Sequence, residues 1–322
     1  MKHIKSKFIM FFILFLVQES SSEFIKSVLK GDFMYKFLSL LTGILLAIMI
    51  AINGNLTSVY GILWGTVIIH FVGAVVSYII IIFKGKRVKL FFRTALWIYL
   101  GGAVGVLTVL FNNYSFREIS ITSIGALGLL GQMLTSLVID YFGLFGMQKV
   151  KFTWQSLASL PFAFVGIIIM FDFNNLSAMV AILFSILSGV SIVLARTINS
   201  KLSDIIGALE GSYINHLVGG VTSLVIALVF ASGEISTFTF NSNVWIYLGG
   251  SFGVLVVLLG NITVPKLSSL DITILAFVGQ VLMSSALDIM FGLGINSSFY
   301  GGLIISLGII FSLLLAKVKS VK

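Results

Sequence analysis

Long apolar stretches alternate with short polar connections along most of the chain. Each stretch is close to the roughly 20 residues that an α-helix needs to cross a hydrocarbon core of about 30 Å. Backbone polar groups in lipid must be satisfied within a helix, and the strict alternation of barrel strands is absent. The pattern therefore predicts an all-α integral membrane protein with ten transmembrane helices. The expected spans are 36–54, 61–83, 95–113, 119–142, 154–172, 177–197, 205–231, 243–263, 268–292 and 299–317.

Composition agrees with this class and removes several chemistries. Hydrophobic residues make up 58% of the 322 residues and charged residues only 10%, whereas a soluble domain carries about 25% charged residues. The chain has no cysteine and three histidines, which excludes a disulfide scaffold and a thiolate site and argues against a histidine-rich metal site. We expect no cofactor and no metal.

The distribution of lysine and arginine predicts the orientation. The connection 84–93 is rich in lysine and arginine, so the positive-inside rule places it in the cytoplasm. With the N-terminus also inside, Arg117 is the single basic residue on the outer side, so 19 of the 20 basic residues are inside. This partition predicts an even number of spans with both termini cytoplasmic, and it explains the net charge of +9 without a nucleic-acid partner.

Residues 1–33 form an N-terminal extension outside the ten-span pattern. The apolar run 8–17 follows three lysines and is too short to cross a bilayer. It resembles a signal sequence without an obvious small-residue cleavage site. The alternative, which we favour, is that translation begins at Met34.

The phrase WIYLGGAVGVL at 97–107 returns at 245–255 as WIYLGGSFGVL, with 9 of 11 positions identical. Other matched blocks are HFVGAVVS (70–77) with HLVGGVTS (216–223), and GQMLTSLVID (131–140) with GQVLMSSALD (279–288). The repeats are 34–175 and 176–322. Because five spans are an odd number, the second repeat enters the membrane from the opposite side. Such inverted repeats are typical of secondary transporters, whose substrate site lies near the midplane.

The blocks NGNLTS, HFVG, WIYLGG and GQ-LTSLVIDYFGLFG resemble those of the YdcZ-type family of the drug/metabolite transporter superfamily, alongside EamA-like carriers. The resemblance covers residues 34–317. Members of the family are commonly a single five-span unit, and this chain resembles two fused units. The resemblance implies small-molecule transport, in the direction of export, across a bacterial cytoplasmic membrane. The second copy departs from the pattern where Glu210 replaces Trp64 and DIMFGLG replaces DYFGLFG.

A polar stripe with a spacing of four residues occurs on the fourth predicted span and again on the ninth. The two copies are Gln132, Ser136 and Asp140, and Gln280, Ser284 and Asp288. This spacing places each set on one helix face. The stripe is interpreted either as a substrate-linked or proton-linked wall of a central cavity or as hydrogen bonding that joins two helices. The aspartates, predicted near opposite membrane surfaces, would serve as gates or as anchors.

Glu210 is the most specific single candidate, because its repeat partner is Trp64. An isolated carboxyl group in apolar surroundings favours its neutral form, which would suit proton coupling. The alternative is a structural pair with Arg196, Lys201 or His216.

His70 and His216 are counterparts in the two repeats. A histidine can relay protons, but their Val-Gly surroundings equally suit packing. Asn53 and Asn199 are also counterparts, predicted to flank the ends of the first and sixth spans. They are candidates for binding a polar substrate or for capping helices.

The aromatic residues of WIYLGG suit the membrane interface, and its glycines suit close helix contact. Phosphate-loop, zinc-protease and esterase motifs are absent, so we do not expect an enzyme. The predicted function is a secondary transporter that exports a small metabolite or drug-like molecule by alternating access, with proton coupling left open. A non-transporting binding or assembly protein is the alternative. The expected partners are the substrate and the bilayer, with a homodimer left open.

Overall fold

The computed structural model is an α-helical bundle. It describes residues 32–86, 95–146, 149, 158, 160–170, 175–233, 239–267, 269–292 and 297–320. The helices are α3 Asp32–Tyr60, α4 Ile62–Phe83, α5 Gly101–Ser115, α6 Ile121–Phe142, α7 Leu160–Met170, α8 Leu176–Ile206, α9 Ala208–Phe230, α10 Gly249–Thr263, α11 Ser269–Met290 and α12 Ser297–Ser320. Short 3₁₀ turns, η1 Leu96–Tyr99 and η5 Val244–Leu248, precede α5 and α10. All but the last two residues of the predicted N-terminal extension lie outside the described residues.

The described helices confirm an all-helical membrane protein. Within the described residues, seven helical segments are long and apolar enough to cross a membrane, and the apolar parts of α7, α11 and α12 are shorter. Each predicted span coincides with one helix. The largest difference is at α8, which continues from the predicted end at residue 197 to Ile206. One face of these last turns is buried inside the protein, where Ile198 is 7% exposed and Leu202 packs with Ile98 and Ile214.

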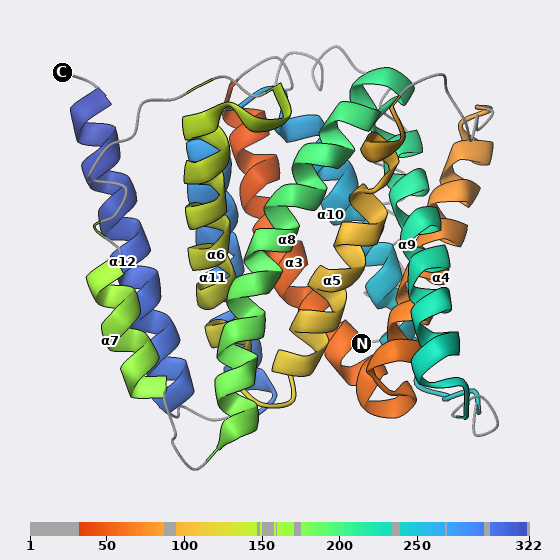
Figure 1. The fold of residues 1–322 in the computed structure, drawn as a ribbon, viewed down its shortest axis with the longest axis horizontal. Helices are drawn as coiled ribbons and strands as arrows, with labels where there is room; N and C mark the ends of the chain where they lie inside the picture. The colour runs from red at the N-terminus through yellow and green to blue at the C-terminus, as the bar shows by residue number, and fades with distance from the viewer. Residues whose placement is uncertain are drawn as a thin grey trace.

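Repeat counterparts follow one another in pairs along the bundle (Figure 1). From left to right the order is α7 and α12, α6 and α11, α3 and α8, α5 and α10, and α4 and α9, and the counterparts that pack on each other are α7 with α12, α6 with α11, and α4 with α9. The first helix of each half packs into the other half: α3 lies on α10 and α11, and α8 lies on α5 and α6. The two halves are therefore interlocked.

Glycines make this interlocking possible. A Cβ atom on Gly189 of α8 would collide with the carbonyl group of Gly128 on α6, and one on Gly43 of α3 would collide with the carbonyl group of Ala276 on α11. These counterpart positions therefore bring backbones into direct contact, as small residues do between membrane helices.

The two WIYLGG phrases lie at opposite ends of the bundle. Ile98 packs near the end of α8 against Leu202, whereas Ile246 packs near the end of α3 against Leu56, and α3 and α8 end on opposite sides in Figure 1. Both tryptophans are 41% exposed. The adjacent glycines make the close contacts: Gly101 and Gly102 meet Asn199 and Asn215, and Gly249 and Gly250 meet Asn53 and Ile69.

Replacing Gly189 with alanine tests the interlocking. The added methyl group cannot be accommodated without moving the α6 backbone, so we expect a loss of about 1–3 kcal/mol in stability, as for other overpacked sites. The measurement is the thermal unfolding midpoint of the purified protein in detergent.

The matched control is Gly260→Ala. Gly260 is also helical, but a Cβ there has nothing within 4 Å, so alanine should leave the midpoint unchanged or raise it. Equal midpoints for the two variants would contradict the proposed contact.

Candidate functional site

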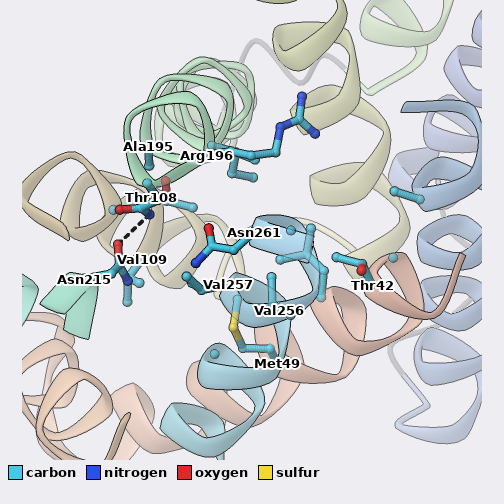
Figure 2. Close-up of a pocket in the computed structure, with 18 of the residues that line it drawn as sticks. Thr42, Met49, Thr108, Val109, Ala195, Arg196, Asn215, Val256, Val257 and Asn261 are labelled. Carbon is cyan, nitrogen blue, oxygen red and sulfur yellow. Dashed lines mark hydrogen bonds between the residues drawn. The ribbon is translucent and has the colours of Figure 1, made fainter. Parts of the chain in front are cut away.

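A cavity of about 150 Å³ lies at the centre of the bundle, among α3, α4, α5, α6 and α8–α11. Its lining comprises Thr42, Gly43, Leu46, Met49, Ile69, His70, Gly105, Thr108, Val109, Gln132, Ile192, Ala195, Arg196, Asn199, Asn215, His216, Gly253, Val256, Val257, Gly260, Asn261, Thr263, Ile272, Ala276 and Gln280. Of these residues, 10 have apolar side chains, 11 have polar or charged side chains and 4 are glycines, and Figure 2 shows the two kinds of side chain side by side. The outer pair α7 and α12 contributes none of these residues.

The middle of the cavity follows the internal repeat. His70 and His216, Gln132 and Gln280, and Gly105 and Gly253 are counterparts, and both members of each pair line it. The cavity therefore lies between the two repeats, where the sequence predicts a substrate site.

The two histidines face each other across this middle. Their ring centroids are 5.8 Å apart, and both residues are 3% exposed. His70 lies against Gly219, and His216 lies against Gly73, which explains why each repeat places a glycine three residues after its histidine. The Nδ1 atom of His216 is 2.9 Å from the carbonyl oxygen of Ser212, whereas neither ring nitrogen of His70 has a partner among the described residues.

The lining continues toward only one end of the bundle. This end carries Lys84, Lys86, Lys201 and Lys266 near the termini of α4, α8 and α10, and it is called the basic end below. The lining residues at the basic end include Arg196, Asn199, Asn261, Thr263 and Ile272. Their repeat counterparts at the opposite end are Ile50, Asn53, Asn113, Ser115 and Ile124, none of which lines the cavity.

At the opposite end, side-chain contacts fill the equivalent space. Asn112 accepts a hydrogen bond of 2.7 Å from Ser188, and Ser115 donates one of 3.0 Å to the carbonyl oxygen of Ala181. Ile50 and Ile124 belong to one apolar cluster. The cavity is therefore packed closed at this end.

Asp288 also belongs to the closed end. Its carboxylate oxygens accept hydrogen bonds of 2.9 Å each from the backbone N–H groups of Ile121 and Thr122. These are the first two residues of α6, so the carboxylate caps a helix N-terminus, where a negative charge is favoured. In this conformation Asp288 joins α11 to α6, which is the anchoring geometry. Ser284, one turn earlier, is fully buried near Gly125 of α6.

Asp140 is the repeat counterpart of Asp288, but its surroundings differ. It lies with Ser136 in a crevice of about 10 Å³ at the basic end, which Arg196 and Ile272 also line. Asp140 and Arg196 interact electrostatically without an ion pair within 4 Å. Arg196 and Ile272 thus separate the crevice from the central cavity.

Glu210 and Trp64 lie outside the cavity lining. Glu210 is in the first turn of α9 and pairs with Lys86 at 2.9 Å. The partners expected from the sequence were wrong because the end of α4 reaches this turn from a distant part of the chain. At the other end, Trp64 donates a hydrogen bond of 2.9 Å from Nε1 to the carbonyl oxygen of Ala231. Both residues tie helix ends together.

The asparagines are not at the ends of helices. Asn53 and Asn199 lie well inside α3 and α8 and are 2% and 4% exposed, so the capping interpretation is wrong for both. The helices extend past them to Gly61 and Gly207, which have positive φ. Asn199 donates a hydrogen bond of 2.8 Å to Asn215 at the cavity wall (Figure 2).

The structure thus brings five of the predicted residues together at the cavity: His70, Gln132, Asn199, His216 and Gln280. The sequence analysis missed Arg196 as a lining residue, because the predicted end of its span placed it at the membrane surface. The signal that was available is the alignment of Gly207 with Gly61, which marks the true end of α8. Within the described residues, no group of three or more His, Asp or Glu side chains could hold a metal ion.

Comparison with known proteins gives the family. The family model DMT_YdcZ, described as "Putative inner membrane exporter, YdcZ", matches residues 34–169 and again 180–316. None of the curated proteins compared matches the chain.

Among solved structures, 15 chains match. One crystal structure aligns with a TM-score of 0.59 at 16% identity, covering 88% of this chain and 96% of the other, a level that shows the fold alone. The two family matches account for both repeats, and the chain therefore belongs to the YdcZ inner membrane exporter family as two fused copies of the family unit.

Proposed function

We propose that the chain exports a small metabolite or drug-like molecule across the bacterial cytoplasmic membrane by alternating access. The observation that carries this proposal is the central cavity of about 150 Å³, which lies between the two repeats, extends to the basic end and is packed closed at the other. Ten spans with cytoplasmic termini put the basic end in the cytoplasm, because lysine and arginine are enriched there. The described conformation is then ready to take substrate from inside.

The repeat indicates what the other conformation requires. At the closed end, Asn112 bonds to Ser188 and Asp288 caps α6. The counterparts at the basic end are Gly260, Thr42 and Asp140, which line the cavity or the crevice. If the two halves exchange conformations, the contacts at the closed end break and the cavity opens there. The basic end then packs closed. Rocking of one repeat against the other is the usual way in which inverted-repeat carriers expose one site to both sides.

The alternative from the sequence is a membrane-embedded binding or assembly protein that does not transport. Glycine contacts would then serve packing alone, and a closely packed apolar interior would be expected. A cavity lined by Gln132, Gln280 and Asn199 favours the exporter instead, because polar groups inside a membrane protein are costly and usually functional.

Filling the cavity tests the proposed function. Val256 lines the cavity from α10, and Val256→Trp should block the space and reduce export at least tenfold. The measurement is untargeted mass spectrometry of the medium from cells that express the wild-type protein or the variant. Compounds enriched by the wild type should lose that enrichment in the variant.

The matched control is Leu107→Trp, because Leu107 is 43% exposed and does not line the cavity. It should release the same compounds as the wild type. Identical media from wild-type and empty-vector cells, or equal release by Val256→Trp, would favour the non-transporting alternative.

Proton coupling has weaker support at Glu210 than the sequence suggested. Its carboxylate is compensated by Lys86 and lies outside the cavity. We therefore expect Glu210→Gln to leave the release of exported compounds within about twofold of the wild type, since a partly exposed pair is worth only about 0–1 kcal/mol. A tenfold lower release by Glu210→Gln than by the wild type, at the same protein level in the cells, would show that Glu210 takes part in transport.

A further inference from the structure

We propose that the cavity binds a small carboxylate with a compact apolar body, and that Arg196 recognises its charge. This inference rests on the proposed function and names the substrate class of the same site.

Arg196 is placed for recognition. It lines the cavity at the basic end, and in Figure 2 its side chain leaves α8 and extends toward α6. Within the described residues its guanidinium group has neither a hydrogen bond nor an ion pair within 4 Å. The repeat counterpart is Ile50, which is 2% exposed in an apolar cluster. The fold shared by the two repeats therefore does not require a charge at this position.

The charge of the lining selects against cations. Among the lining residues that the structure describes there is no aspartate, glutamate or lysine, and Arg196 is the single arginine. The nearest described carboxylate, that of Asp140, lies in the separate crevice. The guanidinium group of Arg196 would repel a cation in the cavity, whereas a carboxylate matches the planar arrangement of its donors.

The size and walls of the cavity define the rest of the ligand. A protein cavity of about 150 Å³ can hold benzene, and Leu46, Val109, Ile192 and Val257 provide apolar walls. Deeper in the cavity, the Oε1 atom of Gln280 and both ring nitrogens of His70 are buried without partners. These groups can hydrogen-bond a small polar substituent on the ligand. An anion also suits export, because an inside-negative membrane potential favours its exit.

Asp140 gives Arg196 an alternative partner. Arg196 borders both the cavity and the crevice, so the carboxylate of Asp140 and an anion in the cavity compete for the same guanidinium group. Removing the negative charge of Asp140 should therefore strengthen anion binding, and removing Arg196 should weaken it.

The test is calorimetric titration of the purified full chain in detergent with three probes of one shape: benzoate, benzamide and benzylammonium. We expect saturable binding of benzoate, at least tenfold weaker binding of benzamide, and no binding of benzylammonium. Arg196→Gln should weaken benzoate binding about 10- to 100-fold, as expected for loss of a charge-assisted hydrogen bond. Lys201→Gln, which removes a positive charge from the same helix outside the cavity, should leave benzoate binding unchanged.

Asp140→Asn should bind benzoate more tightly than the wild type, a gain that misfolding cannot produce. The proposal is overturned if benzoate does not bind, if benzamide or benzylammonium binds as tightly, or if Arg196→Gln leaves benzoate binding unchanged. Weaker benzoate binding by Asp140→Asn would also overturn it.

The outcomes separate this inference from the proposed function. If benzoate binds through Arg196 but wild-type and empty-vector cells release the same compounds, the carboxylate class stands and export is rejected. If the wild type releases neutral or cationic compounds and Val256→Trp abolishes that release, export stands and the carboxylate class is rejected.

Discussion

The direct backbone contact between α8 and α6 at Gly189 and Gly128, and its counterpart between α3 and α11, is the constraint on which the rest of the structure depends. It inserts the first helix of each repeat into the other repeat. The interlocked halves bring His70 near His216 and place Gln132 and Gln280 around one central cavity. A side chain larger than hydrogen at Gly189 or Gly43 would separate helices whose polar groups have to meet in the membrane interior.

The two repeats are similar in sequence but differ in their local contacts. Asp288 caps the first turn of α6, whereas Asp140, its counterpart, lies in a crevice beside Arg196. Ser115 bonds to the carbonyl oxygen of Ala181, whereas its counterpart Thr263 lines the cavity. A two-fold symmetric protein could not have its cavity extended toward one end only. Because the two halves differ in these contacts, the cavity of the proposed carrier extends toward only one side of the membrane in any one conformation.

Much of the fold could be predicted from the sequence, because apolar length and the internal repeat constrain helices and their pairing strongly. The position of each helix agrees with the pattern, and the family match follows the two repeats. The site was harder to predict because it depends on contacts between distant segments. The pairing of Glu210 with Lys86 and the capping of α6 by Asp288 join residues more than 100 positions apart. Apolarity alone ended the α8 prediction too early, and that error concealed Arg196 at the cavity wall.

The central claim is that one cavity lies between inverted repeats and is reached from the cytoplasm in this conformation. The chain has no cysteine, so single cysteines can be placed at the counterpart positions Asn261→Cys and Asn113→Cys and labelled with a membrane-impermeant thiol reagent. The account predicts that Asn261→Cys, at the cavity wall, reacts in inside-out vesicles and not in intact cells. It also predicts that Asn113→Cys, which is buried at the closed end, reacts much more slowly from the external face. Labelling of Asn261→Cys from outside, or of both positions from one face, would contradict the account.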